Sequence, residues 1–432
     1  MKTKEGQWLD WGRQYPADRT RIEMPASLDE LRATVAEAAT TVRPIGAGHS
    51  FSPLVATGAT VVCLDRFKGV ESIDRDRKVA RVRAGSRLKE LTAALHAEGL
   101  AFRNLGDIDV QSIAGATATA THGTGATLPC LSAEIAGLQI VRADGSIVII
   151  DGETEPDLLM AARVSLGALG VVTHVDFRVV EAHRLHRKTW SMPLTEVLSS
   201  AHDLWRAHRN FEFFYIPFSD YCLCITHDVT DEPSRAGPKG DDDKAVNDLR
   251  LARSLLGWSG RLRRFVIRRE LSRFPAEDAV DYNWKLLASE RNVRFREMEY
   301  HLPPETALDA LGEVIRLIEA RRRDVFFPVE VRQTAGDDSW LSPFQGGSRI
   351  SIAIHSWWKD EHAFMHSLLE PVLLAAGGRP HWGKMHGLGK DRLQSLYPDF
   401  SRFNALRREW DPEGKFLNEH LTKLFGGVDD RG

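Results

Sequence analysis

Hydrophobic residues recur at the three- and four-residue spacing of an amphipathic helix in two segments near the N-terminus. Residues 27–41 open with Ser27, a suitable N-cap, and carry Glu30 three residues later. Residues 88–100 repeat the helical spacing and close on Gly99, a residue typical of helix C-termini. The pattern predicts two helices within the first hundred residues.

Stretches rich in β-branched residues alternate with these helices and predict strands. Residues 59–67 and 78–87 are two such stretches. Residues 134–151 predict a hairpin turned on the Asp144-Gly145 dipeptide. Residues 170–190 predict one long strand. Strands mixed with helices at this spacing indicate an α/β or α+β binding domain.

The middle of the chain follows a different pattern. Residues 211–229 supply two β-rich stretches, and residues 231–248 lose their apolar positions, which predicts an exposed loop. Residues 251–274 predict a pair of basic amphipathic helices. Their arginines could bind anions, but a solvated helix face is the simpler interpretation because the total charge is balanced.

The third quarter of the chain alternates between long helical and strand patterns. Residues 305–323 predict a helix, and residues 325–334 and 348–358 predict strands with alternating apolar and polar positions. Strands of this kind beside helices are typical of a half-exposed antiparallel sheet with helices on one side.

Composition narrows the class of protein. The 432 residues are too many for one ordinary core, so two domains are expected. A net charge of −3 gives no electrostatic reason to expect nucleic acid or an anionic membrane as a partner. The four cysteines lack metal spacing and are expected as reduced thiols in a cytoplasmic protein. No apolar run approaches 18 residues, which argues against a transmembrane segment or a secretory signal.

Two segments of small residues carry the candidate chemistry. The first, Arg43–Leu54 (RPIGAGHSFSPL), places three small residues directly before His49. The second, Asn104–Leu128, strings together Gly, Ala, Ser and Thr for more than twenty positions. Such a segment cannot fill a core, but it can present backbone N–H groups and hydroxyls to phosphate oxygens. Neither segment is a dinucleotide fingerprint or a P-loop.

Five motifs occur in one order along nearly the whole chain: GAGHSFSP, a small-residue segment ending ATATATHGTG, RVSLGALGVVTHVDF, the E-x-R of PVEVR, and HWGK. Together they resemble the aldonolactone oxidoreductases. That group includes sugar-1,4-lactone oxidases, bacterial gulonolactone dehydrogenases and alditol oxidases, within the vanillyl-alcohol-oxidase flavoprotein superfamily. A set of five motifs is far more specific than any one of them.

The resemblance implies that FAD is the cofactor and that His49 is its covalent attachment point, through the 8α-methyl group of the flavin. Two loops would clasp the FAD diphosphate from opposite sides. The residues expected to bind the cofactor are Arg43, Gly46, Ala47, Gly48, His49, Ser50, Phe51, Ser52, Gly106, Asp107, Ser112, Gly115, Ala116, Thr119, Thr121, His122, Gly123, Gly125, Gly167, Gly170 and Val172.

Glu330 and Arg332 are two residues apart and therefore point to the same face of a strand. On a solvated strand such a pair is common. The resemblance implies that it holds a substrate hydroxyl and offers positive charge to the flavin. By the same resemblance, Lys384, His355 and Ser112 join the catalytic set. No group of histidines, cysteines and carboxylates has the spacing of a metal site.

The resemblance implies an α+β fold of the FAD-binding PCMH type (vanillyl-alcohol-oxidase-like), with an antiparallel-sheet substrate domain. We expect an FAD-binding domain over residues 1–182, a substrate domain over 183–384, and a C-terminal segment, 385–432, that packs back on the first domain. The catalytic site is expected at the interface between the domains, where ligand pockets often form.

The expected activity is FAD-dependent oxidation of an aldono-1,4-lactone of the gulono, galactono or arabinono type. Oxidation of a primary alcohol on an alditol or another sugar-bearing molecule remains open. Small residues between Ala114 and Ala120, with Gly123, favour access of O2 and hence an oxidase. The likeness to bacterial gulonolactone dehydrogenases keeps a redox carrier open as electron acceptor. A non-catalytic flavin scaffold and a hydrolytic lactonase are the alternatives from other classes.

Overall fold

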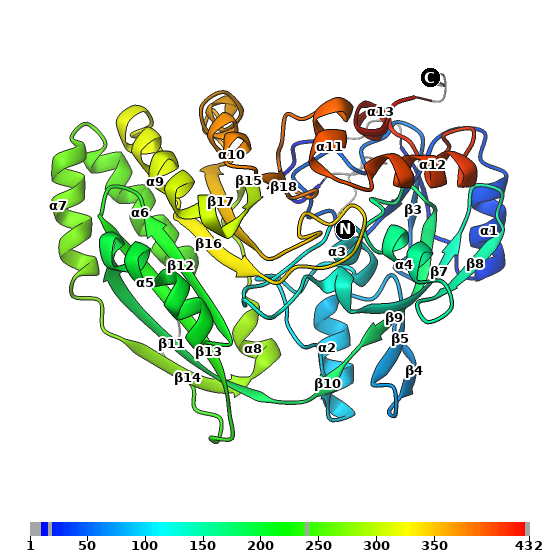
Figure 1. Ribbon diagram of the computed structural model, residues 1–432, viewed down its shortest axis with the longest axis horizontal. Coiled ribbons are helices and arrows are strands. Elements are labelled where there is room, and N and C mark those ends of the chain that lie inside the picture. The colour runs from blue at the N-terminus through cyan, green and yellow to red at the C-terminus, as the bar shows by residue number, and fades with distance from the viewer. Residues whose placement is uncertain (1–9, 16–19, 238–241, 428–432) are drawn as a thin grey trace.

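The computed structural model describes residues 10–15, 20–237 and 242–427. Figure 1 shows two lobes side by side. One lobe is a large sheet with helices along its outer side. The other combines smaller sheets from the first part of the chain with the last helices of the chain.

The large sheet has eight strands, and every neighbouring pair is antiparallel. Its order is β14 (Glu277–Tyr282), β11 (Arg184–Pro193), β13 (Tyr221–Thr230), β12 (Asn210–Ile216), β16 (Val329–Thr334), β17 (Arg349–Trp357), β15 (Phe295–Leu302) and β18 (Arg379–Pro380).

The two faces of this sheet differ because its side chains alternate along each strand. One face is apolar, as the buried Ile350, Ile352 and Ile354 of β17 illustrate, and it shares a core with the outer helices. The opposite face carries ionisable side chains toward the other lobe. The helices of this lobe are α5 (Leu194–Ala207), α6 (Asp242–Leu256), α7 (Gly260–Leu271), α8 (Asn283–Leu287), α9 (Pro304–Arg321), the π-helical turn η2 (Met365–Leu369) and α10 (Glu370–Ala375).

The second lobe contains three smaller sheets. The five-stranded sheet is β4 (Val70–Asp74), β5 (Val79–Arg83), β9 (Val171–Arg178), β7 (Ile135–Val141) and β8 (Ile147–Asp151). The three-stranded sheet is parallel, with β1 (Arg21–Glu23), β3 (Thr60–Cys63) and β2 (Val42–Ile45). The third pairs β10 (Val180–Glu181) with β6 (Leu100–Ala101).

Short helices cover these sheets. From the first part of the chain they are α1 (Leu28–Ala36), α2 (Leu88–Ala97), α3 (Ile113–Ala118), the 3-10 turn η1 (Leu131–Glu134) and α4 (Pro156–Arg163). From the end of the chain they are α11 (Lys390–Leu396), α12 (Phe400–Trp410) and α13 (Glu419–Phe425).

Several predictions from the hydrophobic pattern are confirmed. Ser27 caps α1 and accepts the Glu30 N–H. α2 ends before Gly99, whose φ of +74° is the left-handed conformation expected after a helix. β7 and β8 form the predicted hairpin about Asp144 and Gly145. The antiparallel sheet with helices on one side is also present.

Three details differ from the prediction. Residues 170–190 form β9, β10 and β11, which belong to three different sheets, because the chain crosses from one lobe to the other there. The predicted loop over 231–248 overlaps α6, which begins at Asp242; residues 238–241 lie outside the described residues. The inner face of the large sheet is not half-exposed at β15 and β16, because nearly all side chains of these two strands are buried.

The last helices pack against the first part of the chain. Leu393, Phe400 and Leu421 share a core cluster with Val82 and Ile113. This packing supports the expected division into residues 1–182, 183–384 and 385–432, which we keep as a proposal. The middle segment also reaches this core through Trp340, Leu341 and Phe344.

All four cysteines are free and buried. Within the described residues, no helix combines the length and the apolar character needed to cross a bilayer.

Candidate active site

Two adjoining cavities lie at the meeting of the lobes. The outer cavity is lined by residues of the second lobe, mainly from the loops after β2 and before α3. The inner cavity, of about 440 Å³, is lined by both lobes, including side chains of β12, β15, β16 and β17. His49, Ser50, Gln111 and Thr119 line both. The two cavities therefore share a wall; we call them together the channel, and the inner cavity has the size that small-molecule sites use.

Most of the residues expected to bind the cofactor line this channel. Those on the outer cavity are Arg43, Gly46, Ala47, Gly48, His49, Ser50, Ser52, Ser112, Gly115, Thr119, Gly167, Gly170 and Val172. Those on the inner cavity are His49, Ser50, Phe51, Gly106, Asp107, Thr119, Thr121 and His122. The remaining three, Ala116, Gly123 and Gly125, line neither cavity.

The outer cavity is a cradle of backbone. A Cβ atom added at Gly46 would overlap the Ser112 hydroxyl, so the end of β2 and the start of α3 approach closely only because Gly46 has no side chain. Gly167 has a φ of +66°, and a Cβ there would lie 2.8 Å from the ring of Pro44. Larger residues at these positions would close the space that a ligand backbone or phosphate needs.

Arg43 lines the outer cavity, but its guanidinium donates hydrogen bonds to backbone carbonyls of the protein. It donates hydrogen bonds to the carbonyls of Leu54 (2.9 Å), Gly167 (2.9 Å) and Leu166 (2.6 Å). A further bond, of 2.5 Å, reaches the carbonyl of Phe416. Burial lowers the pKa of Arg43 to about 9. Its place is therefore structural: it ties three distant segments together behind the cavity wall.

Arg87 was not singled out from the sequence, yet it lines the outer cavity. It pairs with Asp65 at 2.8 Å through Nη2, whereas its buried Nη1 has no hydrogen-bond partner among the described residues. A guanidinium nitrogen left unpaired beside a backbone cradle is suited to an anionic ligand such as a diphosphate.

Ser112 lies apart from the rest of the expected catalytic set. It lines the outer cavity and not the inner one. Its hydroxyl is the N-cap of α3 and accepts the Gly115 N–H at 3.2 Å. The structure therefore does not bring Ser112 to Glu330, Arg332, Lys384 and His355, which all line the inner cavity.

His49 stands where the two cavities join. Its ring stacks on Trp11, with centroids 5.7 Å apart. Burial, and then the charges of Arg87 and Lys384, lower the pKa of His49 to about 4. The ring is therefore neutral near pH 7 and keeps a nitrogen lone pair, which a nucleophile needs.

Most ionisable side chains of the inner cavity come from the inner face of the large sheet. Glu330 and Arg332 of β16 share that face, as their spacing predicts. Glu212 of β12 is paired in register with Arg332, and Glu299 of β15 lies opposite Ala353 of β17, which also pairs with Glu330. Charged side chains from three strands, β12, β15 and β16, thus lie on one small region of the sheet.

Arg332 is the centre of this group. Its guanidinium contacts three carboxylates: Asp107 at 3.0 Å, Glu299 at 2.8 Å and Glu330 at 3.5 Å. Arg332 and Glu299 are both buried. Although burial raises it, the pKa of Glu299 is held well below its usual value by Arg332 and then by His122. Glu299 is therefore a buried anion that fixes Arg332 in place.

The pKa of Glu330 shifts in the opposite direction from that of Glu299. Burial raises its pKa well above the usual value, and the carboxylates of Asp107 and Glu212 add to the rise against the opposing effect of Arg332. Burial and then Asp107 also raise the pKa of Glu212, to about 8. Carboxyl groups with raised pKa values are suited to proton transfer near neutral pH.

Lys384 and His355 belong to a second cluster in the same cavity. Lys384 forms an ion pair with Glu297 of β15, and His355 Nε2 lies 3.6 Å from the same carboxylate. His355 Nδ1 hydrogen-bonds the carbonyl of Pro328 at 3.1 Å. Burial lowers the pKa of His355. Glu297 thus orients both residues toward the space that Glu330 lines.

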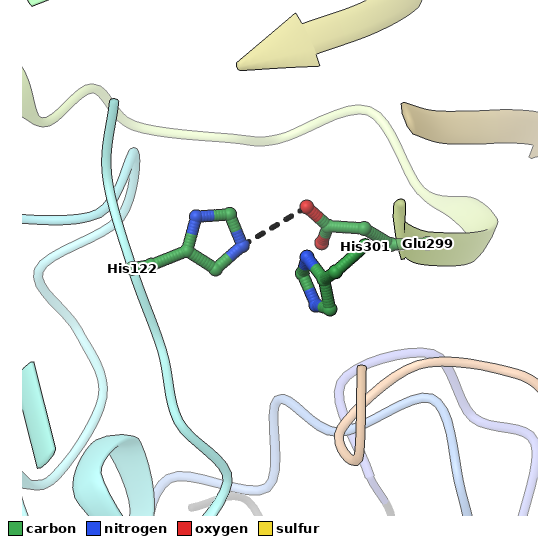
Figure 2. Close-up of side chains that lie close together, drawn as sticks. All are labelled: His122, Glu299 and His301. Atoms are coloured by element: carbon green, nitrogen blue, oxygen red, sulfur yellow. Dashed lines mark hydrogen bonds and ion pairs between the residues drawn. The ribbon is translucent and has the colours of Figure 1, made fainter. Parts of the chain in front are cut away.

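Figure 2 shows His122, Glu299 and His301, whose ligand atoms are close enough together to hold a metal ion. His122 Nε2 lies 3.0 Å from Glu299 Oε1, the contact drawn as a dashed line. The same oxygen accepts a hydrogen bond from Arg332 at 2.8 Å, so the guanidinium already supplies positive charge to this carboxylate. The cluster is better described as a hydrogen-bonded support for Arg332.

Sequence reasoning missed Glu212, Glu297 and Glu299. Their signal is the same as that of Glu330 and Arg332: polar residues at alternate positions of an otherwise apolar strand. In FREMEYHL, residues 295–302, Glu297 and Glu299 alternate with apolar positions.

Comparisons with known proteins identify families and relatives that this chain resembles. Residues 175–424 match the family described as D-arabinono-1,4-lactone oxidase, and residues 20–151 match the family described as FAD binding domain. L-gulono-1,4-lactone dehydrogenase of Mycobacterium tuberculosis is 35% identical over 426 residues, covering 97% of this chain and 99% of that protein. Alditol oxidase of a Streptomyces species is 32% identical over 446 residues, covering 97% and 99%.

Among solved structures, cholesterol oxidase from Brevibacterium sterolicum matches with a TM-score of 0.79 at 15% identity, over 97% of this chain and 96% of that one. At this identity the likeness concerns the fold alone. Together with the match to the FAD binding domain family, it confirms the expected α+β fold of the FAD-binding type.

Proposed function

Because this chain belongs to the D-arabinono-1,4-lactone oxidase family and is an FAD-dependent oxidoreductase, we propose that it oxidises an aldono-1,4-lactone of the gulono, galactono or arabinono type at the carbon beside the carbonyl. Bound FAD supplies the hydride acceptor for this oxidation. The observation that carries the proposal is the pair Glu330 and Arg332, buried on the inner cavity that adjoins the cofactor cradle.

The residues of the channel fit FAD. The backbone of Gly46–Ser52 and the start of α3 would hold the diphosphate, with the unpaired Nη1 of Arg87 beside it. The need for glycine at Gly46 supports a ligand in close contact with the main chain. The flavin would then extend past His49 into the inner cavity.

We propose that His49 binds FAD covalently. Its neutral ring and its position at the junction of the cavities support this. Acid precipitation tests it: the pellet of the purified protein should remain yellow, and that of His49→Ala should be colourless. A colourless pellet from active unmodified protein contradicts the covalent bond.

Four residues of the inner cavity belong to the proposed catalytic set. Glu330 accepts the proton of the substrate hydroxyl, for which its raised pKa is suited. Arg332, held by Glu299 and Asp107, binds that hydroxyl and provides positive charge where negative charge develops on reduction. Lys384 is a second cation, and His355 lines the same wall.

Anaerobic bleaching of the flavin tests the activity. We expect the absorbance near 450 nm to be lost on mixing with one or more aldono-1,4-lactones. Bleaching by alditols and not by lactones would instead support the alternative function, oxidation of a primary alcohol, as the name of the Streptomyces relative suggests. No bleaching by either class would contradict a sugar oxidoreductase, and lactone hydrolysis by flavin-free protein would indicate a lactonase.

We propose O2 as the electron acceptor. Ala114, Gly115 and Ala118 of α3 line the outer cavity with little bulk, which supports gas access. The name of the M. tuberculosis relative points instead to a carrier. Stopped-flow mixing of substrate-reduced protein with air-saturated buffer separates the two: reoxidation over minutes, with fast turnover on a dye or cytochrome, would make the protein a dehydrogenase.

A cytoplasmic location is also a proposal. Four buried free thiols support a reducing compartment. Measured thiol content of freshly prepared protein would test it, since disulfide-bonded cysteines would contradict it.

A further inference from the structure

Exposed hydrophobic side chains gather at one end of the molecule. Of the ten large hydrophobic residues exposed in the described part of the chain, six lie on α6, α7 and the turn between them. α7 lies at the edge of the sheet lobe, far from the C-terminal helices (Figure 1). We call this surface the α6–α7 patch; its members are Leu251, Leu255, Trp258, Leu262, Phe265 and Val266.

The patch is held outward by specific contacts. The inner face of α7 is fixed by Arg263, which donates to the carbonyls of Arg323 (2.8 Å) and Val325 (2.9 Å), and by the buried Ile267. α6 is fixed by Arg253, which pairs with Asp360 at 2.7 Å. The opposite sides of both helices therefore have to face solvent.

The apolar exposure is large. Trp258 is 74% exposed and Phe265 is 63% exposed. Isolated exposed hydrophobic residues are ordinary, but six of them on two consecutive helices and the turn between them mark an interaction surface.

The patch is flanked by positive charge. α7 carries five arginines and one glutamate, although the whole chain has a net charge of −3. Within the described residues, the exposed side chains of Arg261 and Arg269 take part in no ion pair. The balanced total charge, which gave no reason to expect an anionic membrane, conceals a local concentration of charge.

We propose that the α6–α7 patch docks on a membrane surface rich in anionic lipid. The two helices would lie in the interface, with Trp258 and Phe265 at the boundary of headgroups and acyl chains and the arginines among lipid phosphates. With 15 and 12 residues, α6 and α7 are too short to span a bilayer. The chemistry of an aromatic and aliphatic stripe flanked by free arginines matches this partner.

Contact with a second copy of the chain fits less well. A two-fold contact through the patch would bring the arginines of both α7 helices close together, and their like charges would repel. An anionic lipid surface complements the same charges.

One helix, α6, belongs both to the patch and to the wall of the inner cavity. The first turn and a half of α6 contributes Asp243 and Val246 to the wall of the inner cavity, while Leu251 and Leu255 further along belong to the patch. Docking would therefore hold one wall of the substrate cavity close to the membrane. The inference does not depend on which sugar is the substrate.

Vesicle co-sedimentation of the FAD-loaded protein tests the proposal. We expect binding to vesicles of phosphatidylcholine with about 30 mol% phosphatidylglycerol to be at least about tenfold tighter than binding to phosphatidylcholine alone. The double variant Trp258→Ser/Phe265→Ser should lose most of this binding. The variant Arg261→Gln/Arg269→Gln should lose the preference for anionic lipid while retaining flavin absorbance.

The matched control removes equally exposed hydrophobic residues elsewhere. Ile149 and Val229 are 62% and 60% exposed, on β8 and β13. The double variant Ile149→Ser/Val229→Ser should bind vesicles as the unmodified protein does. Absence of vesicle binding, equal loss in the control, or an unchanged preference for anionic lipid in Arg261→Gln/Arg269→Gln would each overturn the proposal. Self-association abolished by Trp258→Ser/Phe265→Ser, with no vesicle binding, would assign the patch to a second copy.

Discussion

The outer and inner cavities adjoin each other, but backbone lines the first and ionisable side chains line the second. The outer cavity is a backbone surface: Gly46, Gly48 and Gly115 give it shape, and most of its lining has no charge. The inner cavity is a side-chain surface, in which Glu299, Arg332 and other ionisable residues from several strands are brought together. A protein can therefore place cofactor binding and catalytic chemistry in adjacent spaces that are lined by different kinds of residue.

The two cavities also differ in how their residues affect the stability of the folded protein. Ordering a loop rich in glycine and alanine on folding costs chain entropy, but such a loop buries no charge. Buried carboxylates and guanidinium groups must compensate one another, since an unpaired buried charge is strongly destabilising. Substitutions in the two cavities should therefore fail in different ways, which the following predictions test.

The largest effect is expected in the inner cavity. Arg332→Ala and Glu330→Gln should each slow flavin reduction by substrate at least about a hundredfold, because they remove transition-state charge stabilisation or the proton acceptor. Both should retain FAD, because neither residue lines the outer cavity. Rapid-reaction absorbance measures the rate, and Gln333→Ala, on the opposite face of β16, is the control. Near-normal rates in both variants would remove them from the site.

The pH dependence of the same step should follow Glu330. Its pKa is raised well above the usual carboxyl value, and the ionised form is the proton acceptor. The rate of flavin reduction should therefore fall about tenfold per pH unit below that raised pKa and level off above it. Glu330→Gln should abolish this limb of the profile. If the limb persists in the variant, another group, with Glu212 the first to examine, controls the rate.

Substitution in the outer cavity should lower cofactor content more than chemistry. In Gly46→Val, the added side chain overlaps Ser112 and pushes β2 from α3, so purified protein should contain less than about half the FAD of the unmodified protein. The flavin that remains should be reduced at a rate within about threefold of normal. Gly312→Ala, where an added Cβ meets nothing within 4 Å, is the control for protein quality. Full FAD content in Gly46→Val would show that the cradle is not rigid.

The smallest effect is expected for Ser112→Ala. Because Ser112 caps α3 and lines only the outer cavity, its loss should cost about 1 kcal/mol of unfolding free energy. Flavin reduction should change by less than about threefold, since no transition-state contact is lost. Denaturant titration and rapid mixing measure the two quantities. A hundredfold loss of rate would return Ser112 to the catalytic set.

The sequence allowed the outer cavity to be predicted in detail because its residues are contiguous. The run around His49 follows β2, and the run from Ser112 to Thr119 comprises α3 and its two ends, so a local motif describes each. Even there, Arg87 was missed because its unpaired nitrogen depends on where β5 and α2 meet the loops. Local pattern also predicted the helices, the hairpin at Gly145 and the antiparallel sheet.

The inner cavity could be predicted only in part. Glu330 and Arg332 were found because they share a short motif, whereas Glu299 and Glu212 come from β15 and β12, which are neighbours of β16 or β17 only after the sheet has formed. Strand order is set by long-range pairing, which a hydrophobic pattern does not encode. The division of 170–190 among three sheets was missed for the same reason.

The hydrogen bond from Arg43 to the carbonyl of Phe416 joins residues 373 positions apart, and Val42 and Leu54 contact Lys415 and Asn418 in the same way. On a ribosome, which adds roughly 5 to 20 residues per second, about 20 to 75 s pass between synthesis of the two ends of that bond. During that interval the outer cavity lacks the contacts that Lys415, Phe416 and Asn418 make with the segment around β2. The outer cavity is therefore complete only after the segment around Phe416 has been synthesised and has joined the first part of the chain, and we expect FAD to bind after that point.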